Sequence, residues 1–220
     1  MKLFLDTANV SEIKEALSWG ILDGVTTNPT HVSKEGREFY PLIEEICTIF
    51  PEGEISAEVT ATDSEGIIKE AKQIAALSDN ILVKVPLIVE GIKAIKVLAR
   101  ENVKINCTLC FSAVQAMLAA KVGAYYISPF VGRLDAVGTN GMELVQQIRM
   151  IYDNFGFKTK VLAAALRSPM HVLDSALAGA DVSTMSFPIM KQLFEHPLTD
   201  KGLTQFLADW EKVPKGSIKK

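Results

Sequence analysis

A lysine lies in the middle of the apolar run ILVKVP, at residues 81–86. A strand this apolar, in a chain that alternates strands and helices, is buried on both faces and gives an ammonium group no easy route to water. Burial disfavours the charged form, so Lys84 can act as a free amine that attacks a carbonyl carbon and forms an imine. The alternatives are a position in a surface groove or a structural ion pair with Asp6 or Glu58.

Imine chemistry also needs groups that move protons and hold a water molecule. Asp6, Glu58 and Thr108 each close, or nearly close, a different predicted strand. In this mechanism Asp6 takes the proton from the hydroxyl whose carbon is released, while Glu58 and Thr108 hold the water. Each residue also has a structural interpretation: Asp6 as a helix cap, Glu58 as a salt-bridge partner, and Thr108 as a residue that favours strands.

Two arginines lie just past predicted strands, in the segments SPFVGRLD (128–135) and AAALRSP (163–169). The guanidinium groups of Arg133 and Arg167 have the planar fork that grips a phosphate through two hydrogen bonds. Placed on one rim, the pair predicts a phosphorylated substrate. The alternative is that each arginine simply belongs to a charged surface.

The elements that must position these residues alternate along the whole chain. Runs rich in β-branched residues predict strands at 2–6, 23–28, 54–60, 81–86, 103–109, 124–130, 158–166 and 181–187. Apolar residues at helical spacing predict helices at 9–19, 39–50, 63–77, 90–100, 112–122, 140–154, 169–178 and 188–195. Asn9 or Ser11 can cap the first helix and Asp63 the third, and a loop is predicted after Pro29.

Eight strand and helix units predict an α/β fold, a single (β/α)8 TIM barrel over residues 1–220 with an extra C-terminal helix at about 200–212. A doubly wound open sheet is the alternative, and no G-x-G-x-x-G motif supports nucleotide binding by such a sheet. No linker divides the chain into further domains.

A barrel carries its working residues at the carboxyl ends of its strands. As this rule predicts, polar residues lie at or near the ends of six predicted strands: Asp6, Asn28, Glu58, Lys84, Thr108 and Arg167. Side chains two apart on a strand share a face, so we expect three pairs to point together: Asn106 with Thr108, Ser128 with Phe130, and Ala165 with Arg167.

The composition argues against several classes of function. A formal net charge of -3 and a pI near 5.7 provide no basic field for a polyanion, so we expect no nucleic-acid partner. No apolar run approaches the roughly 18 residues of a membrane span. The start MKLFLDTANV reaches Asp6 too early for a signal peptide. We therefore expect a cytoplasmic protein without a membrane partner.

Cysteine and histidine are sparse. Three cysteines are consistent with reduced thiols rather than a disulfide framework. Cys107 and Cys110 form the motif CTLC, but no second pair exists and positions three apart on a strand point to opposite faces, so we expect core packing. His31, His171 and His196 are separated from one another and match no metal-binding pattern, so we expect no metal.

Seven segments, in order, closely resemble the small transaldolase family, the short subfamily that also contains fructose-6-phosphate aldolase. They are FLDTAN, DGVTTNPT, VKVP, NCTL, SPFVGRLD, HPLTDKGL and FLADWEK, and the resemblance runs from Met1 to about Lys212. It implies a (β/α)8 barrel, no metal and no organic cofactor, and a Schiff-base lysine that matches Lys84. It also implies a reaction of the pentose phosphate pathway, the transfer of a dihydroxyacetone unit from fructose 6-phosphate or sedoheptulose 7-phosphate to an aldose phosphate.

The resemblance implies a role for each candidate position. Asp6 resembles the acid/base at the cleaved bond, and Glu58 and Thr108 resemble the pair that holds the catalytic water. The other positions match substrate contacts: Asn28, Asn106 and Ser128 for the dihydroxyacetone hydroxyls, Phe130 for an aromatic wall, and Arg133 and Arg167 for the phosphate clamp. Members of the subfamily are commonly decamers of two pentamers with the C-terminal helix packed on a neighbour, so we expect a homo-oligomer, a pentamer or a decamer.

Two positions separate transferases from aldolases in this subfamily. The aldolases that this chain resembles carry glutamine at the position of Glu58 and tyrosine at the position of Phe130. Both residues favour a transaldolase. The alternative is a fructose-6-phosphate-type aldolase that releases free dihydroxyacetone. A catalytically silent barrel that serves as an assembly subunit is a third interpretation, but it would have little reason to place these side chains at strand ends.

Ala165 departs from the family pattern, which usually has a serine two residues before the second arginine. If that hydroxyl bonds the phosphate, its absence removes a charge-assisted hydrogen bond of roughly 1.5–3 kcal/mol. We therefore expect weaker use of phosphorylated substrates than in a serine-bearing relative.

Overall fold

Eight short runs of apolar and β-branched residues form the strands of the protein, whose computed structural model describes residues 1–214. Residues 215–220 of the predicted domain lie outside this range. The strands are β1 (Lys2–Asp6), β2 (Gly24–Thr26), β3 (Glu54–Glu58), β4 (Ile81–Pro86), β5 (Ile105–Cys110), β6 (Tyr126–Pro129), β7 (Lys160–Leu166) and β8 (Val182–Met185).

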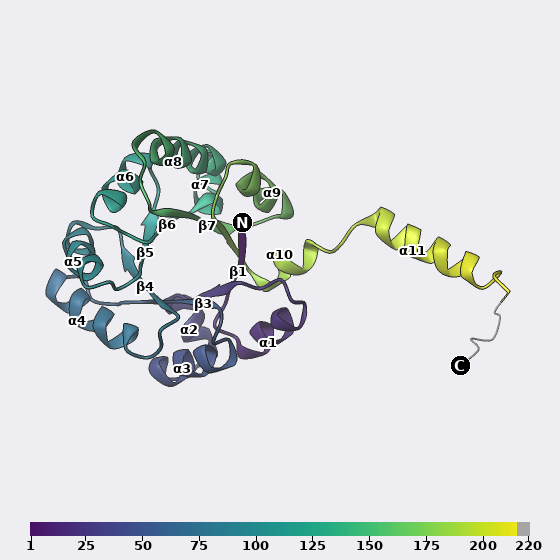
Figure 1. Ribbon diagram of the computed structural model, residues 1–220, viewed down its shortest axis with the longest axis horizontal. Coiled ribbons are helices and arrows are strands. Elements are labelled where there is room, and N and C mark those ends of the chain that lie inside the picture. Colours follow the sequence, from purple (N-terminus) through teal and green to yellow (C-terminus); the bar gives the residue numbers. More distant parts are fainter. Residues whose placement is uncertain (215–220) are drawn as a thin grey trace.

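The strands pair in chain order, all parallel, and close into a barrel (Figure 1). Closure comes from the pairing of β8 with β1, which sets Val182 opposite Lys2 and Met185 opposite Leu5. The predicted (β/α)8 barrel is therefore confirmed, and the open sheet is wrong.

Helices form a ring outside the barrel (Figure 1). They are α1 (Val10–Ser18), α2 (Pro29–Glu35), α3 (Phe39–Ile49), α4 (Ser64–Ala75), α5 (Val89–Arg100), α6 (Ala113–Lys121), α7 (Val131–Asp135), α8 (Gly141–Phe155), α9 (Pro169–Leu177), α10 (Phe187–Gln192) and the additional α11 (Pro197–Trp210). The longer ring helices bury an apolar stripe, as α4 does with Ile67, Ala71 and Ile74.

Two short helices stand where the sequence did not predict helix. The loop predicted after Pro29 is helix α2, because Asn28 caps it by accepting a hydrogen bond from the His31 N–H (2.9 Å) and proline suits its first position. Helix α7 follows β6 directly, and its five residues are too few to show a helical period. The cap predictions are correct for Asn9, which accepts from Ser11 and Glu12, and for Asp63, which accepts from Gly66.

The core has two layers. The larger layer lies between the strands and the helices, and the smaller one fills the barrel interior with Phe4, Leu82, Tyr126, Leu162, Ala164 and Val182. At the amino-terminal end of the barrel, the buried Tyr126 hydroxyl donates to Glu54 (2.7 Å), which also pairs with Lys2 (3.1 Å). Apolar packing and this polar cluster therefore fill the barrel below the carboxyl ends of the strands.

Two strands contain irregularities that break the two-residue alternation. The register shifts between Cys107 and Cys110 and between Ala163 and Leu166, where Leu109 and Ala165 take left-handed φ values of 62° and 57°. Because of the first shift, Cys107 and Cys110 lie together in the layer between strands and helices, and the prediction of opposite faces is wrong. Both thiols are free and buried, as core packing predicts.

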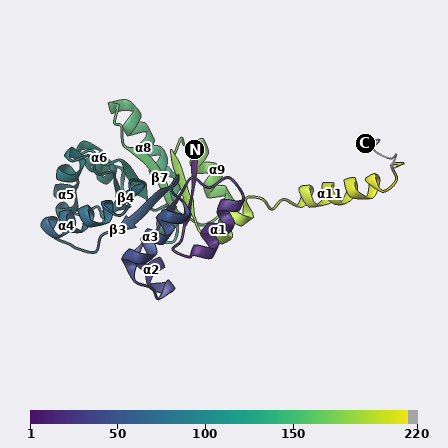
Figure 2. The ribbon, with the colours of Figure 1, turned by 60° about the horizontal axis from the view of Figure 1, so that its bottom comes forward.

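Helix α11 extends away from the barrel in both ribbon views (Figures 1 and 2). None of its residues is buried, although Leu203, Phe206, Leu207 and Trp210 form an apolar stripe. Within residues 1–214, no helix is long and apolar enough to cross a membrane.

The Tyr126–Glu54 contact leads to a stability prediction. Burial, followed by the contact with Glu54, raises the pKa of Tyr126, so the phenol stays a neutral donor. We expect Tyr126→Phe to lower the free energy of unfolding by about 1–3 kcal/mol, because Glu54 loses its buried donor. Urea denaturation followed by circular dichroism measures this change. The control Tyr40→Phe, at a side chain 41% exposed, should change it by less than about 0.5 kcal/mol; equal effects would contradict the prediction.

Candidate active site

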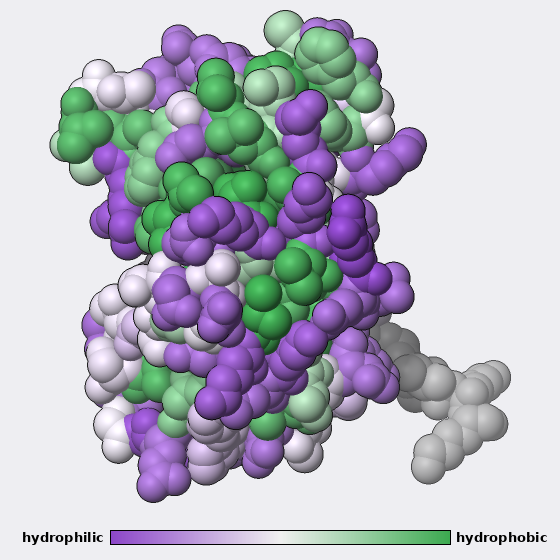
Figure 3. Space-filling view, turned by 90° about the vertical axis from the view of Figure 1, so that its left-hand side faces the viewer, coloured by the Kyte–Doolittle hydropathy of each residue, from purple (hydrophilic) through white to green (hydrophobic). Residues whose placement is uncertain are grey.

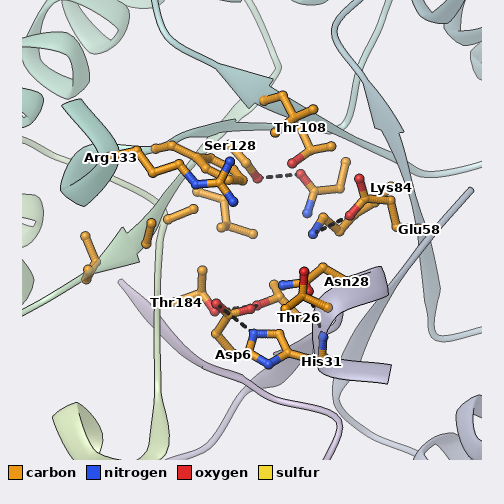
Figure 4. A pocket seen from close by; sticks show the side chains of 18 of the residues that line it. Asp6, Thr26, Asn28, His31, Glu58, Lys84, Thr108, Ser128, Arg133 and Thr184 are labelled. Carbon is orange, nitrogen blue, oxygen red and sulfur yellow. Dashed lines mark hydrogen bonds and ion pairs between the residues drawn. The ribbon is translucent and has the colours of Figure 1, made fainter. Parts of the chain in front are cut away.

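A cavity of about 440 Å³ opens at the carboxyl ends of the strands (Figure 4). The structure brings all ten candidate residues of the sequence to its lining: Asp6, Asn28, Glu58, Lys84, Asn106, Thr108, Ser128, Phe130, Arg133 and Arg167. They come from seven of the eight strands or from the segments that follow them. On several strands, the inward-facing residue two positions before the cavity residue is apolar. These apolar side chains form the floor of the cavity.

Lys84 is the most buried charged group of the cavity, with a residue exposure of 5%. Its Nζ lies 3.1 Å from Oε2 of Glu58 and donates to the Thr27 carbonyl at 2.9 Å. Glu58 reaches it because β3 and β4 place the two residues opposite each other in register. A surface groove is therefore excluded for Lys84, whereas the ion pair with Glu58 is present.

Asp6 lies across the cavity from Lys84 and is held on both carboxylate oxygens (Figure 4). Oδ1 accepts from Thr26 Oγ1 (2.8 Å), which lies 2.6 Å from Thr184 Oγ1, and Oδ2 lies 3.4 Å from His31 Nε2. Asn9 caps the following helix, so Asp6 is not a helix cap.

The charge state of Asp6 follows from these neighbours. Burial raises its pKa, but the contact with His31, the charges of His31 and Lys84, and the bond from Thr26 together outweigh burial. The pKa of Asp6 is therefore held below its usual range, and the carboxylate is ionised at neutral pH. It is a proton acceptor rather than a donor in the resting protein.

Two polar side chains of one cavity wall, Ser128 and Asn106, form a hydrogen-bonded row with Ser56 behind them. Ser128 Oγ donates to Asn106 Oδ1 (2.6 Å), and Asn106 Nδ2 donates to Ser56 Oγ (3.2 Å). All three are buried. Next to them, Thr108 lines the cavity, and its Oγ1 is buried and bonds to no other described residue.

Arg133 and Arg167 lie on the rim and are exposed. The Arg133 guanidinium stacks over the Phe130 ring at 4.7 Å, and Phe130 packs edge-on against Phe111. Within residues 1–214, the arginines that form ion pairs are Arg37 and Arg149, so the two rim guanidinium groups keep their donors for a ligand.

His171 joins the two segments that carry these arginines. Its Nδ1 accepts from the Arg167 N–H (3.1 Å), and its Nε2 lies 3.2 Å from Asp135 Oδ2 at the end of α7. Gly132 lets α7 approach closely, since a Cβ there would clash with the Ala165 carbonyl oxygen and the Arg167 side chain. The packing of α7 on the end of β7 thus sets the separation of the two backbone segments that carry Arg133 and Arg167.

Sequence reasoning missed several cavity residues, of which His31 is the most informative. It also missed Thr26 and Thr184, whose hydroxyls support Asp6. The signal for His31 was present in the segment NPTH (28–31), where a cap and a proline start a helix whose third residue is the histidine. The same order recurs in SPMH (168–171), where Ser168 caps α9 and His171 also faces a carboxylate.

The arrangement suits nucleophilic carbonyl chemistry. A buried amine, a carboxylate beside it, a second ionised carboxylate opposite, and a polar wall surround a space that two arginines border. Such a set can form an imine with a carbonyl, move protons, and bind a phosphate. No group of three His, Cys, Asp or Glu side chains within residues 1–214 is placed to hold a metal ion.

Comparisons with known sequences agree with this chemistry. The sequence pattern of the family described as Transaldolase/Fructose-6-phosphate aldolase matches residues 3–216. A probable transaldolase of Dictyoglomus turgidum is 59% identical over 98% of this chain and 100% of its own length. A probable transaldolase of an Anaeromyxobacter species (strain Fw109-5) is 58% identical over the same shares of the two chains.

Among solved structures, the fold is similar to two other barrels. Thiamine phosphate pyrophosphorylase from Pyrococcus furiosus aligns with a TM-score of 0.60 at 19% identity, over 84% of this chain and 85% of its own. For 3-hexulose-6-phosphate synthase from Salmonella typhimurium the TM-score is 0.64 at 19% identity, over 84% and 89%. These similarities concern the fold, whereas the match over residues 3–216 and the relatives above half identity carry the family assignment. The chain belongs to the transaldolase/fructose-6-phosphate aldolase family.

Proposed function

We propose that this protein is a transaldolase, which transfers a dihydroxyacetone unit from a ketose phosphate, fructose 6-phosphate or sedoheptulose 7-phosphate, to an aldose phosphate. The observation that carries the proposal is the buried Lys84 amine beside Glu58 in a cavity bordered by two arginines. The relatives named probable transaldolase support the same reaction. The proposal places the enzyme in the pentose phosphate pathway, and hence in the cytoplasm.

The first step is imine formation at Lys84. Glu58, whose Oε2 lies 3.1 Å from Nζ, takes a proton and leaves a free amine that attacks the C2 carbonyl of the donor. The carbinolamine then loses water, and we assign Glu58 and the unpartnered hydroxyl of Thr108 to hold this water. The ion pair seen in the structure is the resting form of this pair.

The second step breaks the C3–C4 bond. Asp6, ionised in the resting protein, takes the proton of the C4 hydroxyl, and the aldose phosphate leaves as an aldehyde. The electron pair of the broken C3–C4 bond stays on the dihydroxyacetone unit and forms the enamine. The enamine attacks the acceptor aldehyde, whose oxygen receives the proton back from Asp6. Hydrolysis of the new imine returns Lys84 and releases the product ketose.

Substrate contacts follow from the lining of the cavity. Asn106 and Ser128 form the buried wall near Lys84, and Asn28 closes it from the start of α2. We assign these amide and hydroxyl groups to the hydroxyls of the dihydroxyacetone unit, and Phe130 to an aromatic wall. Arg133 and Arg167 bind the phosphate at the opposite end of the substrate.

Exposed apolar surface supports a homo-oligomer, which we propose to be a pentamer or a decamer. The stripe of Leu203, Phe206, Leu207 and Trp210 on α11 has exposures of 58–74%. The side that carries α4 to α6 also shows hydrophobic patches among hydrophilic side chains (Figure 3). A helix with an unburied apolar stripe gains stability by packing on another surface, here a neighbouring subunit.

One experiment tests the reaction. Purified protein is given fructose 6-phosphate with and without erythrose 4-phosphate, and glyceraldehyde 3-phosphate is measured. We expect release that depends on the acceptor, and borohydride with the donor alone should reduce the imine and add the dihydroxyacetone unit to the peptide that holds Lys84. Lys84→Met should abolish release, while Lys96→Met, at an exposed lysine of α5, should not change it.

The outcomes separate the alternatives. Release without an acceptor would instead show a fructose-6-phosphate-type aldolase with the same nucleophile. If fructose 6-phosphate and sedoheptulose 7-phosphate both give no release and no trapped imine, the result contradicts both enzymes and favours a silent barrel.

A second prediction concerns Phe130, which carries no proton donor. A tyrosine hydroxyl at this position could protonate the enamine, so Phe130→Tyr should raise the ratio of free dihydroxyacetone to transferred product. Phe155→Tyr, at a side chain 71% exposed on α8, serves as the control. The ratio is measured from both products in one assay, and an unchanged ratio in Phe130→Tyr would refute this role.

A third prediction concerns Ala165, which lines the cavity two residues before Arg167. Ala165→Ser should lower the Michaelis constant for the sugar phosphate by about tenfold, because a hydroxyl there adds one hydrogen bond to a charged group. Ala176→Ser, exposed on α9, is the control. Steady-state kinetics with fructose 6-phosphate measures the constant, and equal constants in the two variants would show that the hydroxyl does not reach the phosphate.

A further inference from the structure

His31 is the imidazole that faces the proposed acid/base. Its Nε2 lies 3.4 Å from Oδ2 of Asp6, and its side chain is 23% exposed within the cavity lining (Figure 4). The backbone of His31 is fixed as well, since its N–H donates to Oδ1 of the cap residue Asn28 at 2.9 Å. The ring therefore projects toward Asp6 from a defined helix start rather than from a loose loop.

The two oxygens of Asp6 are supported from different elements. Oδ1 accepts from Thr26 on β2, and Thr26 is fixed in turn by Thr184 on β8. Oδ2 faces His31 on α2. A facing carboxylate favours the ring tautomer with the proton on Nε2, so the imidazole offers its donor side to Oδ2. Contact on both oxygens restricts rotation of the carboxylate.

We propose that His31 is a positioning residue for Asp6 and that its contact with Oδ2 orients the carboxylate toward the bond that is broken. The inference rests on the transaldolase function proposed above. His31 itself does not contact the reacting atoms in this scheme. Asp6 takes and later returns one proton per transfer, and His31 keeps its contact with Oδ2 throughout.

Other charged groups face the same carboxylate. Lys84 on β4 adds to the attraction, but its charge is shared with Glu58 on β3. Arg133 and Arg167 lie on the rim of the same cavity, and Glu35 on α2 contacts Asn9 instead. Because burial raises the pKa of Asp6 and the contact with His31 is the largest opposing effect, removal of the imidazole should raise that pKa.

Three variants test the inference. His31→Leu removes the donor at similar side-chain size, and His31→Gln replaces Nε2–H by an amide N–H that does not titrate. Lys34→Gln, exposed on the same helix, controls for disturbance of α2. For each, kcat and KM of acceptor-dependent transfer are measured across pH. The carboxyl titration of Asp6 is followed by NMR with ¹³C-labelled aspartate, and Asp6→Asn assigns the signal.

We expect His31→Leu to lower kcat about ten- to hundredfold, with little change in KM, because Asp6 loses its orientation. The acid limb of its pH profile should move to higher pH, together with the NMR midpoint of Asp6. His31→Gln should restore most of kcat, and Lys34→Gln should match the wild type.

Different results would overturn the inference. An unchanged kcat and acid limb in His31→Leu would show that Asp6 works without the imidazole, and a rise in KM alone would make His31 a binding contact. An Asp6 midpoint that is equal in wild type and His31→Leu would refute the coupling directly. This NMR result does not depend on turnover, so it still decides the role of His31 if the wild type shows no acceptor-dependent transfer.

Discussion

The structure depends on how a barrel interior accommodates one buried ammonium group. Moving such a charge out of water costs several kcal/mol unless acceptors replace the lost hydration. At Lys84 the acceptors are Glu58, which the register of β3 and β4 sets directly opposite, and the Thr27 carbonyl at the end of β2. Three adjacent strand segments therefore determine the position of one nitrogen, and that nitrogen is the proposed nucleophile.

The barrel interior has an apolar layer toward the amino ends of the strands and a polar layer around Lys84 at their carboxyl ends. Toward the amino ends of the strands, Phe4, Leu82 and Leu162 fill the space. Two residues further along the same strands, the inward positions of β1 and β4 are Asp6 and Lys84. The apolar layer thus separates the polar cluster at the amino-terminal end from the polar side chains that line the cavity. Fold stability and site chemistry thus use successive positions of the same strands.

Periodicity and residue type were sufficient to predict the barrel, the position of Lys84, and the convergence of the ten candidate residues, because each depends on local pattern and on the rule for strand ends. They were not sufficient where tertiary packing sets the backbone. Leu109 and Ala165 take left-handed φ values although neither is glycine, so no local signal predicts them. The register shift next to Leu109 places Cys110 on the same side of the strand as Cys107, which the two-residue alternation did not predict. Helices α2 and α7 are too short to show a period.

The histidines show the limit of motif reasoning more clearly. His31 and His171 match no metal or catalytic pattern, and no local pattern connects them with distant carboxylates. Yet each follows a cap residue and a proline at a strand end, and each faces a carboxylate, at 3.4 Å for Asp6 and 3.2 Å for Asp135. The capped helix start fixes where the imidazole goes, and the barrel brings a carboxylate from another segment to meet it.

This repeated arrangement links the two ends of the cavity. At one end His31 contacts the carboxylate that is proposed to move the proton, and at the other His171 joins the segments that carry the two arginines. Both contacts depend on a short helix that begins just after a strand. The barrel therefore determines the position of each imidazole through a capped helix start. The orientation of the proposed acid/base and the placement of the segments that carry the proposed phosphate clamp therefore have the same physical origin, although His31 and His171 are more than a hundred positions apart in the sequence.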